Sequence, residues 1–250
     1  MTDAWPYPRI FAHRGGGTLA PENTLAAFRL GQSLGYRAHE FDVKLSKDNV
    51  PVLLHDATLE RTTNGTGSAA DFDYAELAKL DAGGWHSAQF AGEPMPTFAS
   101  VAELLRSKDT MANVEIKPTP GLERETGRRV AAEAARLWKG GAVQPLLSSF
   151  SFEALMAAKE AAPGLPLGWL SRKVVDEDWP RLEQLGAVSI HTNHTRLDPP
   201  QVARLRAAGY RVMLYTVNEV ETAQRLFDLG VDGIFTDNLR EFAAKFPALI

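Results

Sequence analysis

The chain has 250 residues, a formal net charge of −4 and no cysteine. The lack of cysteine excludes disulfide bonds, thiolate zinc sites and cysteine nucleophiles within this sequence, and the acidic balance argues against a protein that binds nucleic acid non-specifically. No apolar run approaches the roughly 20 residues of a membrane span, and the opening residues lack the pattern of a signal peptide. We therefore expect a cytoplasmic protein without stable membrane association.

Strand-like and helix-like segments alternate along the chain from residue 9 onward. The expected strands cover residues 9–12, 37–43, 111–117, 145–148, 167–170, 187–191, 210–215 and 231–235. Glycine, the usual residue of a left-handed helix cap, directly precedes four of the helix-to-strand transitions, at positions 35, 186, 209 and 230. Eight strands with intervening helices predict a (β/α)₈ TIM barrel, and a doubly wound open sheet is the alternative. Asn218 with Glu221 resembles a capping box that opens one of the later helices.

A second strand-like segment follows the strand at residues 37–43. Turn residues at 47–49 separate the segments 41–45 and 50–55, which predicts a β-hairpin. The hairpin would return His55 to the side of Glu40 and Asp42. The next 40 residues, 57–96, have no strong period apart from a short helix over 73–80, and long irregular loops in compact domains are often functional. We expect a small insertion lying over the site, within one domain that spans residues 1–250.

Acidic residues alternate with apolar residues on two of the expected strands. Glu40 and Asp42 point to one side of their strand because side chains have a period of two, and Glu115 and Lys117 repeat the pattern. Burying carboxylates is costly without a cation or hydrogen bonds. Three carboxylates converging at strand ends would make an oxygen-rich site for Mg²⁺ or Ca²⁺. The alternative is that these acids pair with arginines or lie on an exposed edge.

Two histidines and two cations accompany the acids. His13 and His55 each end an apolar strand, and such a pair can act as general base and general acid on opposite sides of a phosphorus centre. Arg14 and Lys117 are candidate phosphate ligands, and Tyr215 could form a wall of the pocket. Each histidine could also make only a structural hydrogen bond, and each cation could only pair with a neighbouring carboxylate.

Six short motifs, spread in order along the chain, resemble those of the glycerophosphodiester phosphodiesterase family, particularly its bacterial cytosolic members. They are His13-Arg14-Gly15, Pro21-Glu22-Asn23-Thr24, Glu40-Phe41-Asp42-Val43, His55-Asp56, Glu115-Ile116-Lys117 and Tyr215-Thr216-Val217-Asn218. The resemblance implies a barrel of the phosphatidylinositol phospholipase C-like type. It also implies metal-dependent hydrolysis of small glycerophosphodiesters to sn-glycerol 3-phosphate and an alcohol.

The resemblance assigns a role to each matching residue. Glu40, Asp42 and Glu115 would hold one divalent cation, His13 and His55 would act as the acid–base pair, and Arg14 and Lys117 would contact phosphate. The family's last motif usually starts with tryptophan, where this chain has Tyr215, so the shape of the alcohol pocket is open.

Two other functions remain possible from the sequence. A barrel with three carboxylates and magnesium could abstract a proton beside a carboxylate, as enolase-type lyases do, but that chemistry does not need two histidines around a phosphate. A non-catalytic protein that binds a metal or a glycerophosphodiester is the second alternative.

Overall fold

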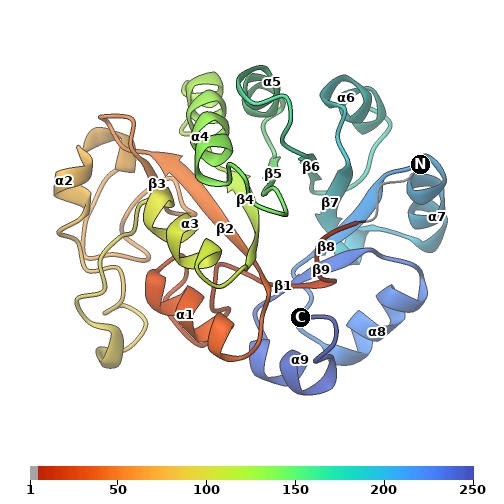
Figure 1. Cartoon of the computed structure of the whole chain (residues 1–250), viewed down its shortest axis with the longest axis horizontal. Helices are drawn as coiled ribbons and strands as arrows, with labels where there is room; N and C mark the ends of the chain where they lie inside the picture. Colours follow the sequence, from red (N-terminus) through yellow and green to blue (C-terminus); the bar gives the residue numbers. More distant parts are fainter. Residues whose placement is uncertain (1–4) are drawn as a thin grey trace.

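In the computed structural model, which describes residues 5–250, eight parallel strands form a closed ring with helices outside it (Figure 1). The strands of the ring are β1 (Ile10–Ala12), β2 (Ala38–Leu45), β4 (Met111–Ile116), β5 (Leu146–Ser149), β6 (Leu167–Ser171), β7 (Ser189–Asn193), β8 (Arg211–Tyr215) and β9 (Gly233–Thr236). Because β1 pairs with both β9 and β2, the sheet closes. The TIM barrel is thus confirmed, and the open doubly wound sheet is excluded.

Eight helices follow or precede the strands of the ring and bury their apolar faces against it. They are α1 (Leu25–Ser33), α3 (Phe98–Arg106), α4 (Glu123–Leu137), α5 (Phe152–Ala161), α6 (Asp178–Leu185), α7 (Pro199–Ala207), α8 (Val220–Asp228) and α9 (Leu239–Lys245). The four glycines that precede strands all have positive φ, between 60° and 93°, as expected for left-handed caps. Among residues 5–250, no helix has both the length and the hydropathy needed to cross a membrane.

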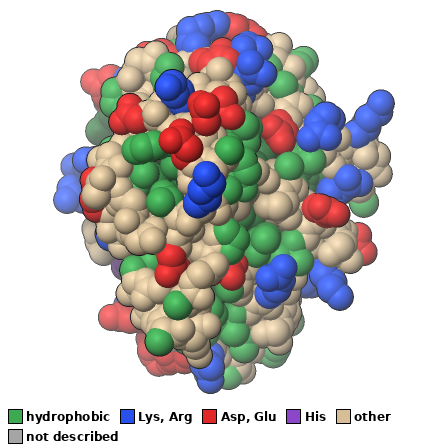
Figure 2. Space-filling model, turned by 90° about the vertical axis from the view of Figure 1, so that its left-hand side faces the viewer, with side chains coloured by type: hydrophobic (Ala, Val, Ile, Leu, Met, Phe, Trp, Pro, Cys, Tyr) green, Lys and Arg blue, Asp and Glu red, His purple; other side chains and the backbone are tan. Residues whose placement is uncertain are grey.

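The predicted hairpin is present. Strand β3 (Pro51–Leu53) runs antiparallel to β2, with Val43 opposite Leu53. The chain then leaves the barrel in a segment with little regular structure, which contains η1 (Ala69–Asp71), α2 (Tyr74–Leu77) and η2 (Ala88–Phe90). Charges of both signs are interspersed on the face that carries this segment (Figure 2).

Segment 57–96 lies beside the barrel rather than over its mouth (Figure 1), so the expected position over the site is wrong. None of its residues lines the main cavity of the barrel. The physical reason is an apolar surface on the hairpin: Val52 and Leu54 pack with Leu59, Leu77 and Met95 in a small core separate from that of the barrel. Burial of these side chains holds the segment at the side of the sheet.

Candidate active site

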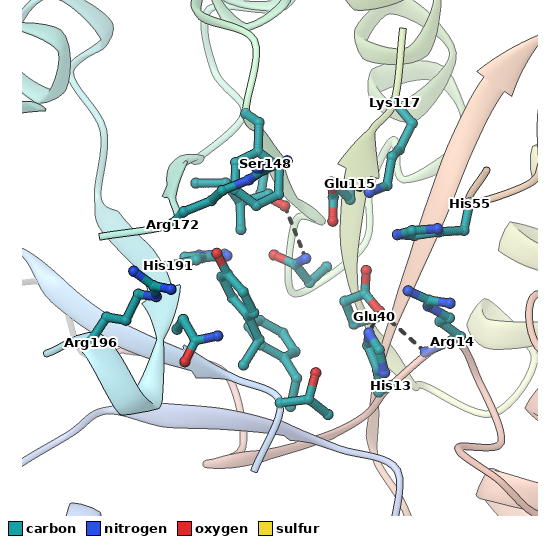
Figure 3. A pocket seen from close by; sticks show the side chains of 17 residues that line it. His13, Arg14, Glu40, His55, Glu115, Lys117, Ser148, Arg172, His191 and Arg196 are labelled. Carbon is teal, nitrogen blue, oxygen red and sulfur yellow. Dashed lines mark hydrogen bonds and ion pairs between the residues drawn. The ribbon is translucent and has the colours of Figure 1, made fainter. Parts of the chain in front are cut away.

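Three carboxylates converge where β2 and β4 run side by side. Glu40 and Asp42 are alternate residues of β2 and point to the same side, while Asp42 is in register with Glu115 of β4. One oxygen from each side chain lies within 4.8 Å of the others, and all three residues are buried. The structure therefore brings together the three predicted metal ligands, and Figure 3 shows Glu40 and Glu115 facing the cavity.

The electrostatics of this cluster fit a divalent cation. Burial, followed by the charge of Asp42, raises the pKa of Glu40 to about 8 and that of Glu115 to about 7. Burial also acts to raise the pKa of Asp42, but the charges of Lys117 and Arg14 outweigh it and hold that pKa below its usual range. A divalent cation would offset the repulsion among the carboxylates. Three hard oxygen donors suit Mg²⁺ or Ca²⁺.

His13 follows β1 and is fixed by an aspartate that follows β9. Its Nδ1 lies 2.6 Å from Asp237 Oδ1, and its Nε2 lies 3.7 Å from Glu40 Oε2. Burial lowers the pKa of His13, but the hydrogen bond to Asp237 and the charges of Glu40 and Asp237 outweigh burial and raise it. Since the carboxylate engages Nδ1, the ring orientation is set and Nε2 remains to exchange a proton.

The glycine run after His13 allows the chain to approach Asp237 closely. The Thr18 N–H donates to the Asp237 carbonyl oxygen at 3.1 Å. Gly17 has a φ of +56°, and a Cβ at this position would collide with the same carbonyl oxygen. Only glycine combines this backbone conformation with this proximity.

Asn218 holds the same aspartate from the β8 side. Its Oδ1 accepts a hydrogen bond from the Asp237 N–H at 2.8 Å, and its Nδ2 donates to Asp237 Oδ2 at 3.3 Å. The expected capping box of Asn218 with Glu221 is therefore wrong. Helix α8 begins after Glu219 without a side-chain cap, because the Asn218 amide is engaged by the end of β9.

His55 has a similar arrangement on the other side of the acidic cluster. Its Nδ1 lies 2.7 Å from Asp56 Oδ1, and Asp56 in turn accepts hydrogen bonds from Arg61. Burial lowers the pKa of His55 more than the charge of Asp42 raises it. The hairpin thus places His55 as predicted, and Figure 3 shows it on the same side of the cavity as Glu40 and Glu115.

Arg14 and Lys117 both line the cavity and both contact the acidic cluster. Arg14 Nη1 lies 2.7 Å from Glu22 Oε1, and its Nε lies 3.6 Å from Asp42 Oδ2. Lys117 Nζ lies 2.9 Å from Glu115 Oε1 and 3.6 Å from Asp42 Oδ1. Each cation is therefore ion-paired and also available to an anion in the cavity.

The cavity has a volume of about 730 Å³ and opens at the carboxyl ends of the strands. Its far wall comes from β5 to β8 and includes Phe150, Arg172, His191, Asn193, Arg196 and Tyr215. Tyr215 lines the cavity, and its hydroxyl donates to the Ser171 carbonyl oxygen at 3.2 Å.

Several residues of the site are not among the predicted ones. Asp237, Arg61 and Arg172 lie in loops, and Arg196 lies in a short 3-10 helix. The sequence around them has no local signal of function. Asp56 had one signal, its position directly after His55. His39 of β2 is buried, and its Nδ1 lies 3.1 Å from the Gly15 carbonyl oxygen.

The fold and the site define a class of protein: a (β/α)₈-barrel hydrolase that acts on phosphate diesters. The glycerophosphoryl diester phosphodiesterase family matches residues 13–241. The chain belongs to this family and is an enzyme that hydrolyses glycerophosphodiesters with formation of sn-glycerol 3-phosphate. This membership sets aside the lyase and the non-catalytic alternatives.

Relatives and solved structures match the chain over nearly its whole length. A glycerophosphodiester phosphodiesterase of Caldanaerobacter subterraneus is 36% identical over 233 residues, which cover 92% of this chain and 93% of the relative. An Oleispira antarctica phosphodiesterase, solved in complex with the product sn-glycerol-3-phosphate, has a TM-score of 0.90 and 34% identity, covering 97% of this chain and 98% of its own. The Agrobacterium tumefaciens glycerophosphodiester phosphodiesterase has a TM-score of 0.78 and 28% identity, with 95% of this chain and 99% of that chain covered.

Proposed function

We propose that His13 and His55 form the acid–base pair of the reaction. One histidine takes the proton from the attacking oxygen, which belongs to water or to the glycerol 2-hydroxyl, and the other gives a proton to the leaving alcohol. One observation carries this proposal: both rings line the same cavity, and a carboxylate lies 2.6 Å and 2.7 Å from their respective Nδ1 atoms. Each ring thus has a set orientation and a remaining nitrogen for proton transfer.

The proposal includes one divalent cation, Mg²⁺ or Ca²⁺, held by Glu40, Asp42 and Glu115. When bound, the cation supplies positive charge that offsets the negative charge of the phosphate oxygens. Arg14 and Lys117 bind those oxygens from either side of Asp42, Arg14 through its planar fork and Lys117 as a point charge. Their pairing with carboxylates in the structure supports this role, because it holds both cations beside the cavity.

The substrate in this proposal is a small soluble glycerophosphodiester, whose alcohol arm lies against Tyr215 and the far wall. The product bound to the Oleispira antarctica enzyme supports the same product here. The interspersed charges of the face in Figure 2 and the net charge of −4 support the view that no nucleic acid is bound. The proposal also places the enzyme in the cytoplasm. It treats residues 1–250 as one domain with a small insertion at 57–96.

The direct test is release of sn-glycerol 3-phosphate from glycerophosphocholine or glycerophosphoethanolamine by the purified protein. The reaction is run with EDTA and again after Mg²⁺ or Ca²⁺ is restored. Activity that is lost with the chelator and recovered with one cation would support the metal assignment and identify the ion. Full activity in EDTA, with no bound metal by elemental analysis, would contradict it.

A further inference from the structure

In the part of the chain that the structure describes, two arginines on the far wall of the cavity have no acidic partner. Arg172 directly follows β6, and Arg196 ends η3 (His194–Arg196), which follows β7. Both line the cavity, and their strands lie across the ring from β2 and β4 (Figure 3). Within residues 5–250, no carboxylate oxygen lies within 4.0 Å of either guanidinium, whereas Arg14 and Lys117 are both ion-paired. The far wall therefore carries uncompensated positive charge.

The turn that presents Arg196 is ordered by a side chain of the site. The Asn193 Oδ1 accepts hydrogen bonds from the Thr195 N–H at 2.9 Å and from the Thr195 hydroxyl at 2.8 Å. These bonds form the start of η3 directly after β7. Arg196 therefore projects from a turn with a defined geometry at the edge of the cavity.

An aromatic wall joins the two sides of the cavity. Lys117 Nζ lies 5.8 Å from the centre of the Phe150 ring, which packs at 6.1 Å against the Tyr215 ring. The Tyr215 hydroxyl then contacts the carbonyl oxygen of Ser171, the residue before Arg172. Burial raises the pKa of Tyr215 to about 12, and the charges of Glu115 and Arg172 act on it in opposite directions. Tyr215 thus lies between the acidic cluster and Arg172.

Positive charge on the wall opposite the acidic cluster has a chemical consequence for the substrate. If the phosphodiester binds at Arg14 and Lys117, an ester arm that follows the aromatic wall would reach the ends of β6 and β7. A guanidinium fork matches the geometry of carboxylate and phosphate oxygens, and a trimethylammonium group at the same place would face like charge. A cavity of about 730 Å³ accommodates a diester together with a substituted arm.

We propose that Arg172 and Arg196 form a subsite for an anionic group, a phosphate or a carboxylate, on the alcohol arm of the glycerophosphodiester. This inference rests on the proposed function and names the substrate class of the same site. Arg172 and Arg196 act here as specificity-determining residues and not in the chemical step.

The test compares kcat/KM for four diesters that differ in the alcohol arm. The arm of bis(glycerophospho)glycerol carries a second phosphate, and that of glycerophosphoserine carries a carboxylate beside an ammonium group. The arm of glycerophosphoglycerol is uncharged, and that of glycerophosphocholine is cationic. The enzymes are the full-length wild type, the double variant R172Q/R196Q, and the control R225Q/R240Q. The control removes the same charge at exposed positions of α8 and α9, outside the cavity. The variant R196Q alone, at an exposed position, serves if the double variant does not fold.

In the wild type we expect kcat/KM for at least one anionic substrate to exceed that for glycerophosphocholine by roughly tenfold or more, as one charge-assisted contact would give. In R172Q/R196Q, kcat/KM for the anionic substrate should fall by roughly 10- to 100-fold. For glycerophosphoglycerol, kcat/KM should change by less than about threefold. In the control variant, kcat/KM should not change for any of the four substrates. Raising the ionic strength should reduce the wild-type preference, since the contacts lie at an exposed rim. Comparison of the phosphate arm with the carboxylate arm identifies which anion is bound.

The two hypotheses fail in different ways. If the wild type releases no sn-glycerol 3-phosphate from any of the four diesters, the proposed function is overturned. The subsite is overturned, while the proposed function stands, if the wild type hydrolyses the diesters and either of two results is found for R172Q/R196Q. The first is a wild-type ratio of kcat/KM between substrates with anionic and cationic arms. The second is an equal fall in kcat/KM for all four substrates.

Discussion

Arg61 binds Asp56 through two hydrogen bonds, from Nε to Oδ2 at 2.6 Å and from Nη2 to Oδ1 at 3.0 Å. The same guanidinium donates to both oxygens of Glu22, at 2.7 Å and 2.8 Å. Asp56 orients His55, and Glu22 accepts from Arg14. Segment 57–96 thus acts on the site without lining the cavity, because one of its arginines joins the partner of His55 to the partner of Arg14.

Replacing Arg61 should therefore impair turnover. Arg61→Ala leaves Asp56 and Glu22 without their shared donor, so the His55 ring loses its set orientation, and a loss of roughly 10- to 100-fold in kcat is expected. Arg61→Lys should restore only part of this loss, because lysine cannot bind both carboxylates with a planar fork. The measurement is steady-state kinetics with a separate cation titration, in which affinity for the cation should not change.

The matched control is Arg128→Ala, which removes an exposed arginine that pairs with Glu125 on the surface of α4. Its kinetics should match those of the wild type. Equal losses in the two variants, or normal kcat in Arg61→Ala, would contradict the positioning role.

The two histidines can be tested separately. His13→Ala and His55→Ala should each lower kcat by roughly 10²- to 10⁴-fold, the usual contribution of general acid–base catalysis. Both variants should still bind sn-glycerol 3-phosphate, measured by calorimetry, because the phosphate ligands remain. His194→Ala is the control, since His194 does not line the cavity. Turnover close to the wild-type value in either folded variant would refute the assignment of that histidine.

Affinity for the cation should depend on pH. In the cation-free protein the pKa of Glu40 is about 8 and that of Glu115 about 7, so protons occupy both groups at lower pH and compete with the metal. Affinity should therefore fall as pH decreases from about 9 to about 6, by up to roughly tenfold per pH unit for each proton displaced. Calorimetric titration in buffers of different ionisation enthalpy should detect proton release. A flat profile without proton release would oppose this prediction.

Close packing of α4 on α5 depends on one glycine. A Cβ at Gly127 would collide with the carbonyl oxygen of Ala154. Gly127→Ala should lower the free energy of unfolding by about 1–3 kcal/mol, the usual range for overpacking, as measured by chemical denaturation. Gly164→Ala is the control, since a Cβ there would meet nothing within 4 Å. Equal stability of the two variants would show that the helices separate at little cost.

Much of the fold follows from local patterns in the sequence. The glycines at 35, 186, 209 and 230 mark where helices end, and periodicity predicts each strand to within about two residues at either end, as the bounds of the structure confirm. Side-chain alternation predicts that Glu40 and Asp42 share one side of β2 and that Glu115 and Lys117 share one side of β4. These features depend on neighbouring residues, which is why they can be read along the chain.

The sequence by itself thus predicted the barrel, the resemblance to the family and the residues of the acidic cluster and its histidines. Only the tertiary structure decided which distant groups complete the site. Asp237 reaches His13 across 224 positions of the chain, because closure of the barrel places β9 beside β1. Closure likewise puts the two far-wall arginines opposite the acids. Such contacts are set by the path of the chain in space, and no local pattern encodes them.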